Sequence, residues 1–365
     1  MKNTGFRERP FEYMRRRTDG ERFPEEVVRN WYIARAFVLE KLKDVAFLPD
    51  FSGHLHAIVD GDSPLMLAVT RQLALSAHYL NHSQRTVISL VTAKGADAII
   101  GELKKEENLG NLPDYCKYSV SGTVKNVESF VDIELNIVRS RPADEGSILI
   151  TEEEARAFAD SSDPATLFSI DTRKAVFAGR AYNLGAAVDN LPYEGPYSPG
   201  RYNQALYTFQ YKVLQDRKTF PLIGQDWETN RAAVLSGLSN IHCSDCFESR
   251  ELAVRRQCSA YDKLSEKKRM ALWEKNNDAL SQSEHNRWVT EKLILGYRPL
   301  NAQEMTEFES LFGQEKSAFV SRLKNDPVSP AHLDICSYRD LRRIDPDNMK
   351  YDSFLMLAIP LILEA

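Results

Sequence analysis

One predicted helix, Asp278 to Leu295, carries two carboxylates and a guanidinium on an otherwise apolar face. Arg287 follows Glu284 by three residues and precedes Glu291 by four, so it can pair with either. Burial of a carboxylate requires such a partner or a ligand cation, because an isolated buried charge is costly. At about 100° per residue, one face about 100° wide holds Leu280, Glu284, Arg287, Trp288, Glu291 and Leu295.

This helix has three open interpretations. In order of preference, they are an ion-pair network that anchors the helix under Trp288, the wall of a polar pocket, and a general acid/base pair formed by Glu284 and His285. The acid/base pair comes last because adjacent helical residues diverge by about 100°, and no nucleophile or second base is indicated. His285 lies one position off the charged face, near Lys292.

The segment His242-Cys243-Ser-Asp-Cys246, followed by Cys258, is the one metal-like cluster in the sequence. A single CxxC without a second pair is a weak zinc signal, and adjacent His and Cys residues rarely reach one ion together. Zinc and a redox dithiol are therefore weaker alternatives to buried, unligated thiols. The odd total of five cysteines indicates free thiols in a reducing compartment.

The clearest supersecondary pattern begins with a short apolar run at Leu55–Val59. A turn over 60–64, a helical pattern at Leu65–Tyr79 and a second apolar run at Thr86–Val91 follow it. Strand, turn, helix and strand at this spacing predict a βαβ unit and a Rossmann-like parallel sheet.

The turn after the first strand lacks most of a dinucleotide-binding fingerprint. The three positions that should hold glycine hold Gly61, Ser63 and Met66. The acidic residue expected after the second strand is also absent, so NAD binding is not favoured. Residues Gly61, Asp62 and Ser63 could at most hold a phosphate or carboxylate, through unpaired N–H groups at the start of the helix.

Further elements are expected on both sides of this unit. Glu25–Lys43 is predicted to be an amphipathic helix that braces the next module. His54 and His56 flank the first strand and are expected at the surface or a sheet edge. The remaining predictions are strands at Tyr115–Val120 and Phe130–Val138, an acidic helix start at Thr151–Glu154, a long loop at Tyr182–Tyr211, and helices at Trp227–Leu238, Phe247–Leu264 and Lys267–Glu274.

The C-terminal quarter, Asn276 to Ala365, resembles a known family. The run Leu280-Ser-Gln-Ser-Glu-His-Asn-Arg-Trp288, followed by Gly296-Tyr-Arg298, resembles the RyR domain, a module repeated in ryanodine receptors and found alone in bacteria. The second half of the family pattern matches His332-Leu-Asp334, Tyr338, Leu341 and Lys350-Tyr-Asp352. More loosely, the preceding region is similar to bacterial proteins that join a TrkA-like Rossmann domain to a RyR domain.

Two features depart from the family pattern. Tyr297 replaces the usual tryptophan after the glycine, which keeps a stacking surface but changes its size. The segment Asn301–Pro330, with an expected helix around Phe308–Leu323, is longer than the usual loop and changes the shape of any pocket.

The resemblance implies a ligand-sensing module without catalytic machinery, for ligands of the adenine-nucleotide type. A nucleotide needs aromatic faces for its base and charged hydrogen bonds for its phosphates. The ligand-binding residues that the resemblance implies are Glu284, His285, Arg287, Trp288, Tyr297, Arg298, His332, Asp334 and Tyr338. Aromatic residues at helical spacing also commonly belong to a core.

The composition is that of a globular protein. Its 365 residues include 47 basic and 52 acidic ones, a net charge of −5, and no basic block that would bind a nucleic-acid backbone. Met1–Arg17 lacks the apolar run of a signal peptide, and the longest apolar stretch, Phe354–Leu363, is too short to span a membrane. We therefore expect a cytoplasmic protein without nucleic-acid or membrane partners.

These observations predict an α/β fold in which a degenerate Rossmann-like domain precedes a mainly helical RyR-type domain. The expected parts are a helical extension at 1–50, the Rossmann-like domain at 51–200, a helical connector at 201–275 and the RyR-like domain at 276–365. We expect a sensor that binds a small nucleotide-derived ligand and reports it to a protein partner or another copy of the chain. The alternatives are a nucleotide-acting enzyme that uses Glu284 and His285, and a pure interaction scaffold.

Overall fold

The computed structural model describes residues 23–43, 55–78, 85–126, 129–144, 146–163, 167 and 238–363. The predicted loop at Tyr182–Tyr211, His54, and all but the last residue of the predicted helix at Trp227–Leu238 lie outside these ranges. The N-terminal elements are α1 (Glu25–Leu42), β1 (His56–Asp60), α2 (Pro64–Ser76), β2 (Thr86–Val91), α3 (Ala96–Leu103), α4 (Leu112–Tyr115), β3 (Lys117–Val120), β4 (Thr123–Asn126), β5 (Ile133–Val138), β6 (Ile148–Thr151) and α5 (Glu152–Ser161). The C-terminal elements are α10 (Leu238–Asp245), α11 (Phe247–Arg256), η4 (Tyr261–Lys263), α12 (Glu266–Ile294), α13 (Ala302–Ser310), α14 (Gly313–Lys324), α15 (Tyr338–Ile344), η5 (Pro346–Asn348) and α16 (Met349–Leu363).

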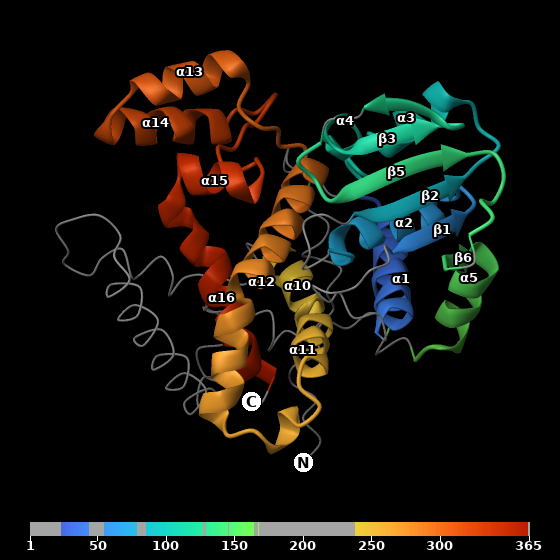
Figure 1. Cartoon of the computed structure of the whole chain (residues 1–365). Coiled ribbons are helices and arrows are strands. Elements are labelled where there is room, and N and C mark those ends of the chain that lie inside the picture. Colours follow the sequence, from blue (N-terminus) through green and yellow to red (C-terminus); the bar gives the residue numbers. More distant parts are fainter. Residues whose placement is uncertain are drawn as a thin grey trace.

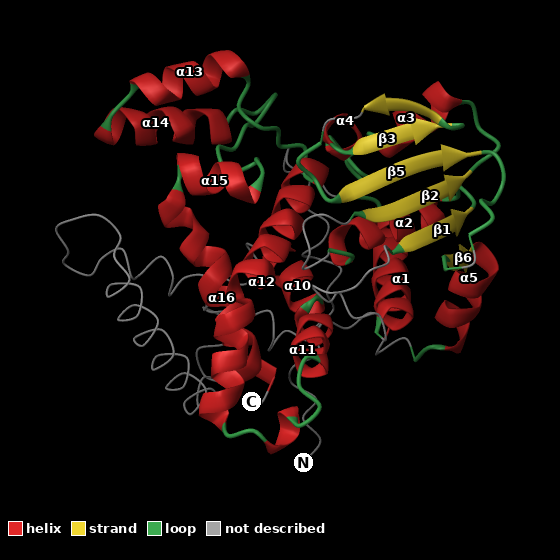
Figure 2. Cartoon of the chain, in the orientation of Figure 1, coloured by secondary structure: helices red, strands yellow, loops and turns green. Residues whose placement is uncertain are grey.

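Six strands form one mixed sheet in the order β4-β3-β5-β2-β1-β6. Every neighbouring pair is parallel except β3 and β4, which form an antiparallel hairpin. Helix α2 packs on β1 and β2, and α1 lies along α2 (Figure 2). The predicted βαβ unit is therefore confirmed, and the fold is α/β with a mainly helical C-terminal part.

Local sequence signals set two helix starts in the α/β part. The hydroxyl of Ser63 accepts a hydrogen bond from Met66 N at 3.4 Å, and Pro64 occupies the first turn of α2, where its missing N–H costs nothing. Thr151 and Glu154 form a reciprocal capping box at the start of α5. The acidic helix start predicted there is confirmed.

Several predicted boundaries differ from the structure. The helix predicted at Phe247–Leu264 ends at Arg256, and the strand predicted at Phe130–Val138 begins at Ile133. The helices predicted at Lys267–Glu274 and Asp278–Leu295 are one continuous helix, α12, so the predicted domain boundary at 275/276 falls inside a helix. The single helix expected around Phe308–Leu323 is instead two helices, α13 and α14. The first helix ends before Gly313, which has a φ of +52° that favours glycine. The strand predicted from Tyr115 begins two residues later, since Tyr115 ends α4.

The expectation that His56 lies at the surface is wrong. Its side chain is buried between two polar partners: Nδ1 lies 2.6 Å from Asp144 Oδ2, and Nε2 lies 2.7 Å from Ser89 Oγ. Both ring nitrogens are therefore used to tie β1 to β2 and to the segment before β6.

Helix α12 connects the α/β part to the helical part (Figure 1). Its C-terminal half places Val289, Leu293 and Ile294 in the main hydrophobic core, together with the sheet and α2. Asn111, which precedes α4, donates from its backbone N–H to Leu293 O at 2.9 Å and from its side chain to Gly296 O at 2.7 Å. The last turn of α12 is thus capped by the α/β part.

Candidate functional site

The charged trio on α12 forms a buried ion-pair network. Arg287 donates to both oxygens of Glu284, at 2.7 to 3.1 Å, and to Glu291 Oε2 at 2.7 Å. None of the three residues is more than 2% exposed. Two residues from other helices complete the network: Arg250 NH2 lies 2.9 Å from Glu284 Oε2, and His242 Nδ1 lies 3.3 Å from Glu291 Oε1. This arrangement matches the first interpretation of the helix.

The network holds its carboxylates ionised. Burial raises the pKa of Glu284, but attraction to Arg287 and Arg250 outweighs burial and holds that pKa below its usual range. The pKa of Glu291 is lowered against burial by Arg287 and then by His242. A carboxylate that stays ionised has no proton to donate near neutral pH, so the geometry gives no support to Glu284 as a general acid.

His285 is tied to the helical part instead. The ring is 2% exposed, and its Nε2 donates to Cys336 O at 2.9 Å. Its Nδ1 lies 3.6 Å from Asp352 Oδ2. Burial lowers the pKa of His285, but the contact with Asp352 more than compensates, and the net shift is upward. Glu284 and His285 therefore have separate sets of partners.

Arg298 holds the start of α13. Its guanidinium forms a two-point pair with Glu304, at 2.7 and 2.8 Å, and its Nε donates to Ser329 Oγ at 2.8 Å. The same Glu304 side chain caps α13 by accepting from Asn301 N at 2.8 Å. Arg298 thus orients the α13–α14 hairpin.

Five rings, three of them from tyrosine and tryptophan, form a continuous row across the helical part. The ring centroids are separated by 5.5 Å between Tyr338 and His285, 6.2 Å between His285 and Trp288, 4.9 Å between Trp288 and His332, and 6.5 Å between His332 and Tyr297. The predicted aromatic residues therefore do come together in space. Two members of the row line different pockets: Tyr338, at one end, lines one, and His332, next to the other end, lines the second.

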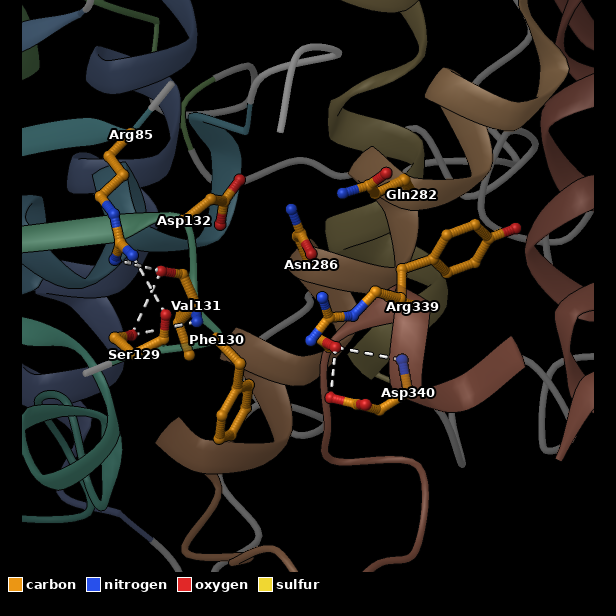
Figure 3. A pocket seen from close by; sticks show the side chains of 11 residues that line it. Arg85, Ser129, Phe130, Val131, Asp132, Gln282, Asn286, Arg339 and Asp340 are labelled. Atoms are coloured by element: carbon orange, nitrogen blue, oxygen red, sulfur yellow. Dashed lines mark hydrogen bonds between the residues drawn. The ribbon is translucent and has the colours of Figure 1, made fainter. Parts of the chain in front are cut away.

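The pocket at the Tyr338 end, called here the junction pocket, lies between the α/β part and the helical part (Figure 3). Its volume is about 780 Å³, within the range of small-molecule sites. Four chain segments line it, with the residues Arg85, Ser129, Phe130, Val131, Asp132, Gln282, Asn286, Ser337, Tyr338, Arg339 and Asp340.

The wall from the α/β part is fixed by its own hydrogen bonds. Arg85 donates to Val131 O at 2.7 Å and to Ser129 O at 3.0 Å. Asp132 accepts from Nδ1 of the buried His78 at 2.9 Å. This wall is therefore rigid before any ligand arrives.

The wall from the helical part carries polar groups that have no partner among the described residues. Gln282 and Asn286 lie one turn apart on α12, and Asn286 is only 7% exposed. Neither carboxamide forms a hydrogen bond with any residue in the described ranges. The guanidinium of Arg339 likewise has no ion pair there. Figure 3 shows Asn286 and Arg339 pointing toward the gap that faces Phe130 and Val131.

A second pocket of about 790 Å³, called here the lobe pocket, lies between α14 and the segment 332–348. His332 and Asp334 line it, so two more of the predicted site residues face an opening. Glu284, Arg287 and Glu291 line neither pocket.

The turn at Gly61 offers an anion few donors. Asp62 accepts from the hydroxyl of Thr92 and lies 3.4 Å from Lys94 Nζ, and Asp60 pairs with Arg141. Ser63 already caps α2. Two carboxylates thus flank the helix start, and they would repel a phosphate.

The thiols of Cys243 and Cys246 are buried against the ion-pair network. Burial raises the pKa of both, that of Cys246 to about 11. In the described part of the chain, no group of three or more His, Cys, Asp or Glu side chains is arranged to hold a metal ion.

No pattern in the sequence singled out Gln282, Asn286 or Arg339. A signal was present in the composition of α12, because the side opposite the charged trio carries the uncharged residues Gln282, Asn286, Val289 and Leu293 instead of lysine and glutamate. A helix whose second face avoids charge packs against protein on both sides.

Comparison of the chain with protein-family models, with curated proteins and with solved structures finds no match. The resemblance to the RyR domain accordingly stays a prediction. No helix within the described ranges has both the length and the apolar composition needed to cross a membrane.

Proposed function

We propose that the chain is a regulatory protein that binds a small nucleotide-derived ligand in the junction pocket. The observation that carries this proposal is the pair of carboxamides, Gln282 and Asn286, which meet no partner among the described residues and open to the pocket. A ligand that enters the pocket can therefore form the hydrogen bonds that these carboxamides do not form with the described residues.

The lining suits the parts of a nucleotide. The two carboxamides offer donors and acceptors that match the edge of a purine base, and Phe130 provides an aromatic face. Arg339 supplies a cation for a phosphate, and the carboxylate of Asp132 can accept a hydrogen bond from a ribose hydroxyl.

The location of the junction pocket suits regulation. One wall belongs to the α/β part and the other to α12 and α15. A ligand that bridges the walls binds best when the two parts keep this relative arrangement, so it shifts the population toward that arrangement. A partner that recognises the same arrangement would then respond to the ligand.

We also propose that the two parts are a Rossmann-like and a RyR-like module. The parallel order β5-β2-β1-β6, with its reversal beside β1, supports the first assignment. The proximity of Trp288, Tyr297, His332 and Tyr338, four of the residues that the resemblance names, supports the second.

A thermal-shift panel of AMP, ADP, ATP, cyclic AMP and ADP-ribose tests the proposal on the full chain. A ligand that binds only the folded state raises the melting temperature in proportion to the logarithm of its concentration. At one hundred times Kd the stabilisation is about 2.7 kcal/mol. If no member of the panel raises the melting temperature at millimolar concentration, the nucleotide proposal fails and the scaffold alternative is favoured.

Asn286→Leu should separate binding from stability. We expect the affinity for the stabilising nucleotide, measured by calorimetry, to fall at least about tenfold, because one or two hydrogen bonds are lost. The free energy of unfolding without ligand should change little, since the amide of Asn286 forms no hydrogen bond with the described residues that the substitution would break. Asn276→Leu is the matched control, because that amide on the same helix is paired with Gln257 and Leu272 O. It should lower stability and leave affinity unchanged; the reverse pattern contradicts the proposal.

Arg339→Gln should weaken binding only for ligands with a phosphate. We expect a loss of about five- to tenfold for ADP and almost none for adenosine, since only the charge on the phosphate is left unpaired. Arg342→Gln on the same helix is the control, because Arg342 pairs with Asp278 outside the pocket. Equal losses for ADP in both variants would show that the effect is general electrostatics.

A further inference from the structure

We propose that the lobe pocket is a second ligand site, which binds a small zwitterion with its anionic group at the lysines of α14 and its ammonium group at Asp334. This site is separate from the junction pocket and does not depend on the function proposed there. Figure 1 shows α14 in the outer hairpin of the helical part, beside α15.

Two lysines line the lobe pocket. Lys316 and Lys324 both line it from α14, and neither forms an ion pair with a carboxylate in the described part of the chain. Lys292 is near His332, which also lines the pocket, and its ammonium lies 5.5 Å from the centroid of Trp288 and 5.6 Å from that of Tyr297. These lysines create a positive potential that attracts an anionic group.

His332 adds a neutral donor to the lining of the lobe pocket. Its Nδ1 accepts from Asp334 N at 3.2 Å, so the ring proton lies on Nε2. Burial, together with Lys324 and Lys292, lowers the pKa of His332 to about 3, so the ring stays neutral near pH 7. An Nε2–H that faces a carboxylate or phosphate would complete the set of donors.

Two aspartates also line the lobe pocket. Asp334 and Asp345 line it, and Asp334 accepts from Asn348 Nδ2 at 2.9 Å. Burial and the neighbouring Asp345 raise the pKa of Asp334 to about 6. An ammonium group placed here would offset both the burial and the repulsion between the two carboxylates.

A ligand with a single charge fits this pocket poorly. A simple anion would meet the aspartates, and a simple cation would meet the lysines. A zwitterion can pair with both kinds of charge in the lining, and the volume of about 790 Å³ leaves room for a short linker between its charges. Carboxylates and phosphates share the anionic chemistry, so ω-amino acids and aminoalkyl phosphates are the two ligand sources to compare.

The test measures the binding of 4-aminobutyrate, 6-aminohexanoate and O-phosphoethanolamine to the full chain by calorimetry. Butyrate, inorganic phosphate and butylamine are controls that carry one kind of charge. At least one zwitterion should bind at least tenfold more tightly than every control, and the better of the two classes identifies the anionic group. Equal affinities for zwitterions and controls, or no binding at all, overturn the proposal.

Two variants locate the ligand within the pocket. Lys324→Gln should lower the affinity for the zwitterion at least fivefold. Asp334→Asn should do the same and keep its bond to Asn348, so the fold is retained. In the original chain, affinity should fall about tenfold between pH 7 and pH 5, because Asp334, faced by Asp345, Asp352, His285 and the neutral ring of His332, loses its charge through a pKa of about 6. Asp334→Asn should abolish that pH dependence; if the dependence persists, the ammonium group is not at Asp334.

Discussion

Replacing Arg287 by methionine should lower the free energy of unfolding by about 3–5 kcal/mol at pH 7. The substitution leaves Glu284 and Glu291 buried without the guanidinium that bridges them at 2.7 Å on each side. Methionine keeps most of the volume and the helix propensity, so the loss of stability measures the effect of removing the positive charge. Urea denaturation followed by circular dichroism measures the effect.

The pH dependence of this loss distinguishes a charge effect from a packing effect. In the original chain, the pKa values of both carboxylates are lowered on folding, so their stabilisation is present above pH 4–5 and is lost as the pH falls through the lowered values. In Arg287→Met, burial outweighs the remaining attraction on Glu291 and should raise its pKa. The defect should therefore be largest at pH 7 and should shrink toward pH 4.5. A defect that is the same at both pH values contradicts this account.

Arg156→Met is the matched control for an exposed pair. Arg156 pairs with Glu152 one helical turn away, at 2.6 Å, but its side chain is 63% exposed. Exposed pairs of this kind contribute about 0.3–0.5 kcal/mol, so the two variants should differ severalfold. Similar losses in both would mean that the buried network contributes little more than a surface pair.

The sequence could predict half of this network. The spacing of Glu284, Arg287 and Glu291 along one helix is local, and it fixes their pairing as soon as the helix forms. Arg250 and His242 come from two other helices, and no spacing rule relates them to α12. Their contribution depends on tertiary packing, which the pattern of one segment does not encode.

The fold shows the same division between local and long-range information. The βαβ unit was predictable because each element carries its own apolar run and its own cap. The continuity of α12 was not, because the polar run around Asn276 and Asn277 looks like a break. Asn276 is instead paired with Gln257, and Asn277 donates to Ser353 Oγ at 2.6 Å. Tertiary partners thus compensate for weak local helix preference.

The candidate sites were the least predictable feature. The junction pocket combines segments that begin near residues 85, 129, 282 and 337, so its existence depends on how the two parts dock. Sequence reasoning found Tyr338 there through the resemblance but not the carboxamides that face it. The residues with the strongest chemical pattern, Glu284 and Arg287, are used by the protein interior instead.

Docking of the two parts includes a close backbone contact at Gly110, and Gly110→Ala should disrupt it. A Cβ at residue 110 would lie 2.3 Å from Ile294 O and 2.9 Å from Ile294 C. Gly110 also has a φ of +52°, which costs a side-chain-bearing residue about 1–2 kcal/mol. Because the obstructing atoms are backbone at the end of α12, they cannot rotate away. We expect a total loss of about 3–5 kcal/mol in the free energy of unfolding.

Gly122→Ala separates the contact from the backbone strain. Gly122 has a φ of +79°, and a Cβ there would meet no atom within 4 Å. Only backbone strain should therefore lower the free energy of unfolding, by about 1–2 kcal/mol. Gly110→Ala should also increase hydrogen exchange of the Asn111 amide, which is bonded to Leu293 O, whereas Gly122→Ala should leave it protected. If Gly110→Ala lowers the free energy of unfolding no more than Gly122→Ala does, the α/β part does not hold the end of α12 as closely as the structure shows. The junction pocket would then lose the rigid arrangement of its two walls, on which its proposed selectivity depends.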